Sequence, residues 1–287
     1  MKRRNLLTAA LAGSAGALLG ASPSRAAYGE VVVRGLTSDQ YHDKFLQLKE
    51  KGLMPVWIDA TQYDGDNYFS AIWRPSTAPW VAKRNMTGQE YQDEFDTHVR
   101  NGYRLTNVRS YREGSKDSDP LYAAIWRKES GPPFVAYHGL NMAAHQYKFE
   151  QLTRDGWAPL NLSVVHLGTE REVTGLYVHQ DVGGLWALQT LEWNEVDQAV
   201  AKAETYGLQC VYLTSWDTIS SADAYSIIFW GYPPGSQDTV VKHEVFDSQV
   251  DTELDYYTVQ RDYLTRCITG SSGHGGGFDY SLVFRRP

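Results

Sequence analysis

Hydrophobic and polar positions follow the same order five times along this chain. An amphipathic helix comes first in each segment, with apolar residues at four-residue spacing, as in Tyr91, Phe95 and Val99. A strand, a polar turn and a second, more apolar strand follow, and a short third strand completes the segment. This order predicts an α+β fold built from tandem helix–β-hairpin–strand repeats.

The second hairpin strand sets the spacing of the repeats. Its letters YAAIWR at residues 122–127 have relatives at 69–74, 174–179, 225–230 and 280–285, so the copies start 51 to 55 residues apart. Five copies at this interval indicate a repeat array in which each unit buries its apolar face on its neighbours. The predicted repeats cover about 34–83, 84–137, 138–189, 190–242 and 243–287.

Capping residues mark where the helices begin and end. Thr37 with Gln40, and Thr87 with Glu90, have the spacing of a capping box, and Gly102 ends the second helix. The later units use other letters at these positions. Asn141 and Asp247 are the expected caps of the third and fifth helices, whereas Glu192 and Asn194 compete in the fourth, because glutamate is a poorer cap.

The short third strand is missing after the fifth hairpin, since the sequence stops at Pro287. A strand of the same kind, Val31 to Val33, stands before the first helix. If it fills the vacant place, the first and last units pair and the array closes into a ring or barrel-like form without open edges. The alternative is an open array in which this strand caps the first repeat.

Residues 1–26 have the pattern of a targeting segment. Arg3 and Arg4 form a twin arginine, an apolar run extends from Leu6 to Leu19, and Ser24-Arg25-Ala26 is a small-residue exit. The apolar run is too short to span a membrane. We therefore expect a twin-arginine-type signal peptide, cleavage, a secreted or periplasmic location, and a single repeat domain over 27–287.

The net charge limits the classes of partner, and the cysteine content bears on a possible disulfide. The formal net charge is -7 and becomes -11 without the targeting segment, which argues against nucleic acid and anionic lipid as partners.

Cys210 and Cys267 are the two cysteines. In an oxidising compartment they could form a disulfide, and two inert buried thiols are the alternative.

The repeat pattern resembles a known family. Tyr-x-x-x-Phe on the helix, YAAIWR, Trp/Phe-Val-Ala and the His138-Gly139-Leu140 entry to the next helix look like the bacterial tandem repeat, also called the polyglycine hydrolase-like structural repeat. In polyglycine hydrolases such repeats accompany a serine β-lactamase-like domain whose nucleophile lies in Ser-x-x-Lys. This sequence contains no Ser-x-x-Lys. The resemblance thus implies the accessory repeat domain and not the enzyme activity.

Two histidines are the best acid–base candidates. His166 and His179 fall in the two hairpin strands of the third repeat, where they could face one another beside Glu170 and Asp181. A hydrogen-bonded structural pair is the alternative. His138 and His243 instead share a repeat position with Arg34 and Arg84, which predicts a structural polar role at the strand-to-helix junction.

Aromatic residues that do not recur in the repeats are candidate ligand contacts. A platform for sugar rings or extended peptides could include Trp57, Trp157, Trp193, Trp216 and Trp230. Recurring aromatics such as Trp73 and Trp126 are expected in the core.

Other short motifs carry weaker signals. His274 and the three glycines after it have the letters of an esterase oxyanion loop, without the G-x-S-x-G that such a loop serves. Asp64 to Asn67, with Asp59, could bind calcium, although a hairpin turn has the same composition. The sequence predicts no metal site and no cofactor.

These observations favour an exported, non-catalytic repeat module that binds an extracytoplasmic polysaccharide, peptide or protein through variable hairpin tips. A secreted hydrolase with a site assembled from several repeats is the alternative, and a purely structural envelope protein is a third possibility.

Overall fold

The structure is a computed structural model that describes residues 24–25, 28–63, 65–112, 119–217, 223–231, 238–272 and 278–287. The predicted signal peptide lies almost entirely outside these residues. No helix in the described part of the chain is long and apolar enough to cross a membrane.

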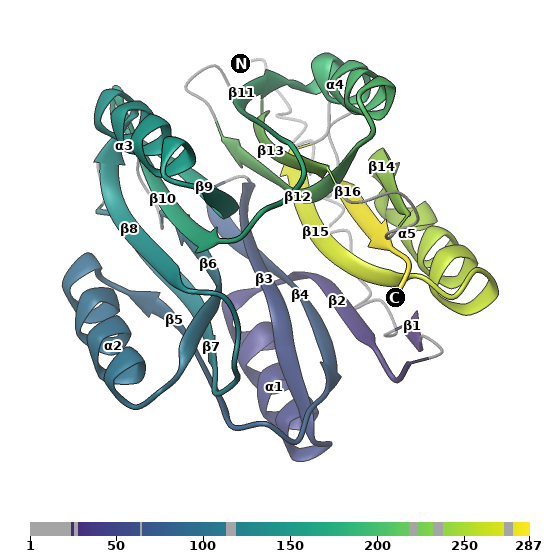
Figure 1. The fold of residues 1–287 in the computed structure, drawn as a ribbon. Helices are drawn as coiled ribbons and strands as arrows, with labels where there is room; N and C mark the ends of the chain where they lie inside the picture. The colour runs from purple at the N-terminus through teal and green to yellow at the C-terminus, as the bar shows by residue number, and fades with distance from the viewer. Residues whose placement is uncertain are drawn as a thin grey trace, which may run out of the picture.

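The fold is mixed α+β, with five helices outside and five antiparallel sheets inside (Figure 1). The helices are α1 (Ser38–Glu50), α2 (Gly88–Arg100), α3 (Met142–Arg154), α4 (Trp193–Thr205) and α5 (Asp247–Leu254). A π-helical segment, Asp255–Gln260, continues α5.

Each sheet contains three strands that we name by their role. The entry strands, which precede the helices, are β2 (Val31–Leu36), β5 (Trp80–Met86), β8 (Phe134–Asn141), β11 (Leu185–Glu192) and β14 (Thr239–Phe246). The inner strands, which follow the helices, are β3 (Leu53–Tyr63), β6 (Arg104–Tyr111), β9 (Trp157–Leu167), β12 (Leu208–Asp217) and β15 (Leu264–Ser272). The middle strands are β4 (Asp66–Pro75), β7 (Leu121–Arg127), β10 (Glu170–His179), β13 (Asp223–Gly231) and β16 (Phe278–Arg285). The two-residue strand β1 (Ser24–Arg25) adds to the edge of the first sheet.

The entry strand belongs to the unit that follows it in sequence. β2 pairs with β4 of the first unit, and β16 pairs with β14 and β15 of the fifth. The prediction that Val31 to Val33 completes the fifth unit is therefore wrong. The helix connects the entry strand to the inner strand, and these two strands run in the same direction. The hairpin turn then reverses the chain, so the middle strand lies between them and pairs antiparallel with both. Each repeat consequently begins a few residues earlier than predicted, at its entry strand.

The YAAIWR strand and its relatives are the middle strands, flanked on both sides. Trp73 and Trp126 are fully buried there, as expected of recurring aromatics. In the third unit the strand pairing shifts the equivalence by one residue. Tyr177 pairs with Val135 as Trp126 pairs with Val81, so Tyr177 and not Val178 takes the tryptophan position.

Helix caps follow the sequence where the capping letters are strong. Both predicted capping boxes, at Thr37 and at Thr87, are present, and Asn141 caps α3. Glu192 is the N-cap of α4, so Asn194 is not its start. In the fifth unit Phe246 occupies the N-cap without a side-chain bond, which displaces the expected Asp247 by one residue.

A polar residue in the second half of each entry strand contacts the helix of another unit. Arg84 bonds the Ser38 carbonyl at the start of α1, and His138 bonds Gln92 of α2. Gln189 bonds His145 of α3, and His243 bonds the Trp193 carbonyl at the start of α4 through Nε2. The predicted structural role of His138 and His243 at this junction is confirmed.

The entry strand of the first unit makes the same kind of contact with the helix of the fifth unit. Arg34 lies 2.9 Å from Asp247 and 2.8 Å from Asp251 of α5. The Trp57 indole nitrogen also donates to the Ile268 carbonyl at 2.7 Å. These contacts join residues more than 200 positions apart in the chain.

The inner strands of all five units lie around a common centre, with the helices outside (Figure 1). Inner strands of successive units pack on each other, and β3 packs on β15. Among the described residues no strand pairing joins one sheet to another, so the five sheets form no closed barrel.

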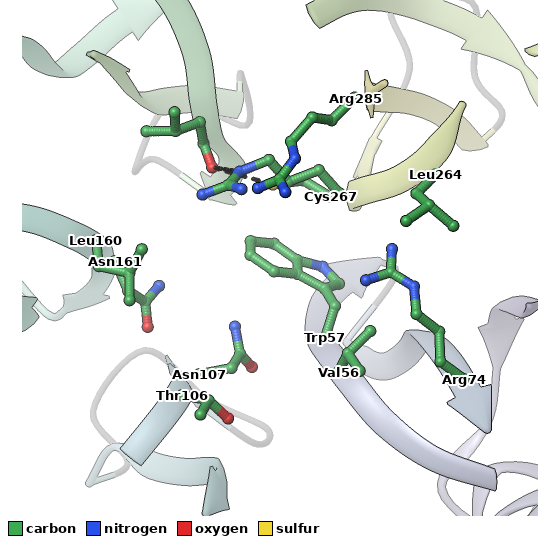
Figure 2. Close-up of a pocket in the computed structure, with 12 residues that line it drawn as sticks. Val56, Trp57, Arg74, Thr106, Asn107, Leu160, Asn161, Leu264, Cys267 and Arg285 are labelled. Atoms are coloured by element: carbon green, nitrogen blue, oxygen red, sulfur yellow. Dashed lines mark hydrogen bonds between the residues drawn. The ribbon is translucent and has the colours of Figure 1, made fainter. Parts of the chain in front are cut away.

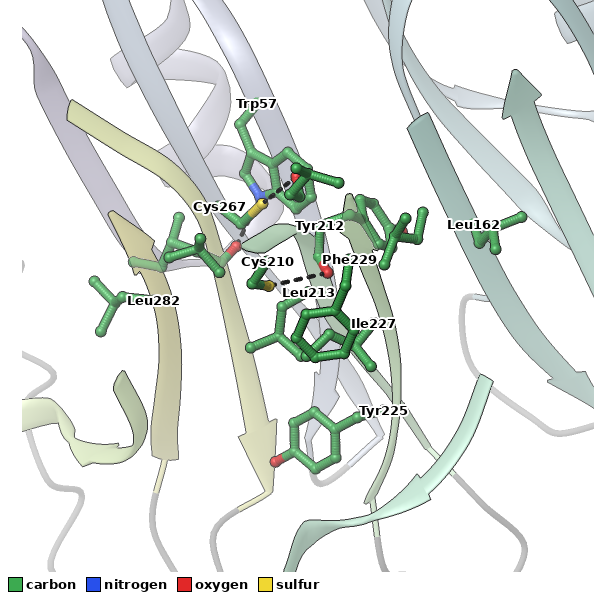
Figure 3. Close-up of a cluster of buried hydrophobic side chains, with 14 of the residues drawn as sticks. Trp57, Leu162, Cys210, Tyr212, Leu213, Tyr225, Ile227, Phe229, Cys267 and Leu282 are labelled. Carbon is green, nitrogen blue, oxygen red and sulfur yellow. Dashed lines mark hydrogen bonds between the residues drawn. The ribbon is translucent and has the colours of Figure 1, made fainter. Parts of the chain in front are cut away.

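Apolar side chains fill the space between neighbouring units. The largest cluster joins the third, fourth and fifth units to Trp57 and Ile72 of the first. Figure 3 shows Trp57 near Tyr212 in this cluster, with ring centroids 5.4 Å apart. The units are thus stabilised by their neighbours, as a repeat array requires.

Candidate functional site

A β-bulge recurs at the same place in every inner strand. In each, one residue is skipped in the pairing with the middle strand. The skipped residues are Val56, Thr106, Leu160, Val211 and Arg266. A bulge re-aims its side chain and often lies near a binding site. Here all five residues line one cavity of about 210 Å³, which we call the inner cavity (Figure 2).

Two asparagines close one side of the inner cavity. The Asn107 side-chain oxygen accepts from the Ile58 amide at 3.2 Å, and that of Asn161 accepts from the Val108 amide at 2.8 Å. Each side chain turns its NH₂ group away from that backbone amide and toward the cavity, as Figure 2 shows, and the Asn161 side chain also bonds Tyr212. The two residues therefore link neighbouring units and provide hydrogen-bond donors.

Three arginines line the opposite side. Arg74 pairs with the buried Glu30 at 2.8 Å and also bonds the Thr265 carbonyl. Arg266 bonds the Val211 carbonyl through Nε. Arg285 extends toward the cavity from the end of β16 (Figure 2).

A second cavity of about 540 Å³ continues outward from the first, and we call it the outer cavity. The two share six lining residues, among them the three arginines. Arg104 and Arg127 add two further guanidinium groups. Glu129, 3.0 Å from Arg127, is the single carboxylate among the described residues that line either cavity.

A buried ion pair lies deeper along the same strands. Arg109 Nε is 3.0 Å from Asp59, and the side chains are 5% and 1% exposed. Asp59 also accepts hydrogen bonds from Thr214 at 3.1 Å and Thr269 at 2.8 Å. These contacts join the first, second, fourth and fifth units and satisfy the carboxylate fully, so this pair is structural.

The five candidate tryptophans do not form one platform. Trp57, Trp216 and Trp230 are buried, with exposed fractions of 7%, 3% and 4%. Trp57 lines the inner cavity and Trp230 the outer one. Trp157 packs edge-on against His179 at 5.1 Å, and Trp193 begins α4 away from both cavities. A flat stacking surface made of all five is therefore excluded.

The two candidate acid–base histidines lie at opposite ends of their hairpin. His166 pairs with Arg171 near the turn, whereas His179 pairs with Trp157 at the open end. His166 is buried and His179 is exposed. The expectation that they face one another is wrong, because the long strands separate them.

Both cysteines are buried free thiols in neighbouring units (Figure 3). Cys267 lines the inner cavity, and burial raises its pKa to about 12. Cys210 lies beside the bulge of β12, as Cys267 lies beside the bulge of β15, and burial also raises the pKa of Cys210. The structure has the thiol form, and the disulfide stays a prediction.

Of the weaker motifs, only Asp59 and residues 65–67 fall within the described residues, and they line neither the inner nor the outer cavity. Residues 274–277 and Asp64 lie outside the described residues. Asn67 donates to the Arg112 carbonyl at 2.9 Å, and Asp59 is committed to Arg109. Within the described ranges, no group of His, Cys, Asp and Glu is arranged to hold a metal ion.

The arginines around the cavities were missed by sequence reasoning. Their positions, Arg74, Arg104, Arg127, Arg266 and Arg285, are scattered over the chain. One signal was available: Arg74, Arg127 and Arg285 all end copies of the YAAIWR strand. A basic residue repeated at strand ends that meet around a centre predicts a local concentration of positive charge.

The comparisons with known proteins concern the repeats. The family model described as "Polyglycine hydrolase-like, structural repeat" matches residues 30–76, 77–129 and 131–178, which is more than half of the chain. Its boundaries begin at the entry strands, in agreement with the sheet topology. No curated protein matches the sequence.

Proposed function

Since the chain belongs to the polyglycine hydrolase-like structural repeat family, we propose that it is an exported, non-catalytic module that binds a polymer or protein outside the cytoplasm. The observation that carries the proposal is the inner cavity. Its lining comes from all five units, so it is a property of the whole array and not of one repeat. The proposed binding site lies at the open ends of the hairpins, opposite the tips that the sequence favoured.

The chemistry of the inner cavity supports binding over bond cleavage. Arginine remains protonated, so it can hold a ligand but cannot act as a general base. With a pKa of about 12, the Cys267 thiol is protonated at neutral pH, and a protonated thiol is a poor nucleophile.

We further propose that the five units act as one closed ring. The contact of Arg34 with α5 repeats the junction contact that joins each pair of successive units. The hydrogen bond from the Trp57 indole to the Ile268 carbonyl is a second link between the first and last units. The ring is held by side chains and packing. It would give the cavity a fixed circumference, which a ligand site assembled from five units needs.

A retention assay tests the binding function. The full chain is immobilised and incubated with cell-wall polymers, polysaccharides and secreted proteins, and both retention and cleavage are scored. Leu160→Trp, which fills the cavity mouth, should abolish retention, whereas Tyr147→Trp on the exposed face of α3 should not. Cleavage of any polymer by the pure protein would contradict the non-catalytic function.

Export is tested separately. The protein should appear outside the cytoplasm with residues 1–26 removed, and replacing both Arg3 and Arg4 with lysine should reduce the exported fraction. The measurement is cell fractionation with mass determination of the exported chain. An uncleaved protein that stays in the cytoplasm would refute this part of the proposal.

A further inference from the structure

We propose that the inner cavity binds a carboxylate group and that the outer cavity receives the chain or ring that carries it. The ligand would thus be an organic acid or the acidic group of a larger molecule. This inference rests on the proposed binding function, and it names the chemistry that the site recognises.

The local charge of the two cavities favours an anionic ligand. Five arginines line the two connected cavities against Glu129, with Glu30 pairing with Arg74 behind them. Among the described residues, these five guanidinium groups outnumber the two carboxylates, although the whole chain carries -7. These arginines are partly exposed, so water screens the repulsion between their guanidinium groups only in part, and an anion placed among them lowers the repulsion that remains.

The polar side chains that line the inner cavity are hydrogen-bond donors. Arg74, Arg266 and Arg285 provide guanidinium donors, and Asn107 and Asn161 provide NH₂ groups, because their oxygens are already bonded to backbone amides. The described residues of the inner cavity include no carboxylate. A wall of donors is complementary to a ligand made of acceptors, and guanidinium groups match the planar geometry of a carboxylate.

The apolar part of the inner lining favours an organic acid over a mineral anion. Half of the inner lining is apolar, with Trp57 at its centre and Leu160, Val211 and Leu264 around it (Figure 2). A fully hydrated inorganic ion gains nothing from such a surface. An acid with a carbon skeleton buries apolar area there while its carboxylate reaches the arginines.

Size divides the roles of the two cavities. At about 210 Å³ the inner cavity is smaller than the roughly 300 Å³ at which pockets for drug-sized ligands begin. It therefore fits one acidic group with a few carbon atoms. The outer cavity, at about 540 Å³, has room for the part of a larger ligand to which that group is attached.

Calorimetric titration of the full chain tests the inference with defined probes. Succinate is the acid, succinamide is the neutral control of the same shape, and inorganic phosphate is the mineral anion. Succinate should bind, succinamide should not, and phosphate should bind more weakly than succinate. Increasing sodium chloride should weaken the binding of succinate, because chloride competes for the arginines.

Variants locate the binding. The double variant Arg266→Gln with Arg285→Gln should raise the dissociation constant for succinate at least roughly tenfold. The matched control is Arg171→Gln, an arginine that stacks on Trp216 and lines neither cavity. Circular dichroism and the melting temperature of each variant check that it is folded.

The outcomes separate this inference from the proposed function. If the chain retains a polymer but succinate fails to bind, or binds the double variant equally well, the carboxylate site is wrong and the binding function stands. If phosphate binds more tightly than succinate, the site is for mineral anions and the inference is overturned. If succinate binds as expected and no polymer or protein is retained, the site stands and the proposed function fails.

Discussion

Arg109 and Arg285 both point toward the centre of the hairpin array, but their surroundings differ. Arg109 is 4% exposed and meets Asp59 at 3.0 Å, with the Ala60 carbonyl at 3.1 Å. Arg285 stands a few residues away along the strands, in a cavity that it shares with two other arginines. A charge that is neutralised inside the protein stabilises the fold, whereas a charge in a cavity wall can also contact a ligand. The four predictions below test this difference.

The largest effect is expected from breaking the buried pair. Asp59→Asn leaves the Arg109 charge buried without a counter-charge and replaces one of the two oxygens that accept from Thr214 and Thr269 by an NH₂ group. We expect the free energy of unfolding to fall by about 3–5 kcal/mol. Urea denaturation measures it, with the exposed Asp66→Asn on the same hairpin as control. A loss similar to that of the control would mean that the pair is not structural.

The second prediction concerns a buried group that stays neutral. Burial lowers the pKa of His145 to about 4, against 6.5 in an unfolded chain. The folded state therefore disfavours protonation, and the stability from this group is complete above pH 6.5 and lost as the pH falls toward 4. A difference of 2.5 in pKa corresponds to about 3 kcal/mol at most. Comparing the pH dependence of unfolding in wild type and His145→Gln checks the slope between pH 4 and 6.5, which should flatten in the variant.

A third, smaller effect distinguishes the contact between the first and last units from those between neighbours in sequence. Arg34→Ala removes the bonds to Asp247 and Asp251, which are about half exposed, so we expect a loss of about 1–2 kcal/mol. Amide hydrogen exchange should increase in α5, more than 200 residues away in the chain. Arg84→Ala, the equivalent change in the second unit, should increase exchange in α1 instead. Unchanged exchange in α5 would argue against the closed ring.

The smallest effect is expected in the cavity. Arg285→Gln removes one of several like charges, so its lost contacts are offset by reduced repulsion. We expect the free energy of unfolding to change by less than about 0.5 kcal/mol. The same urea series measures it beside Asp59→Asn. A loss of several kcal/mol would show that Arg285 is structural, as Arg109 is.

The sequence predicted the local elements well, because their signals are local. Thr37 and Thr87 with their capping partners fix two helix starts, and Gly52 and Gly102 end the same helices at positive φ. Asp262 adopts φ 58° at the corresponding place in the fifth unit, so the interval is kept without a glycine. Such patterns depend on residues three to fifteen positions apart.

The assignment of the entry strands failed because sequence order does not decide which hairpin a strand pairs with. Val31 to Val33 could lie beside either end of the array on pattern alone, and only the path of the helix that follows selects the first hairpin. The cavity was missed for a similar reason. Arg74 and Arg266 are far apart in sequence, and the bulges that direct the lining inward leave no distinctive letters.

The contact of Arg34 with α5 has a consequence for synthesis of the chain. The first unit is synthesised long before α5, because Arg34 and Asp247 are 213 residues apart in the chain. The contact between the first and last units therefore forms late. A product truncated before the fifth inner strand would leave Asp59 without Thr269 and the Trp57 indole without its carbonyl acceptor. Incomplete chains thus lack hydrogen-bond partners at their centre, so the central contacts of the first unit are complete only when the fifth unit is present.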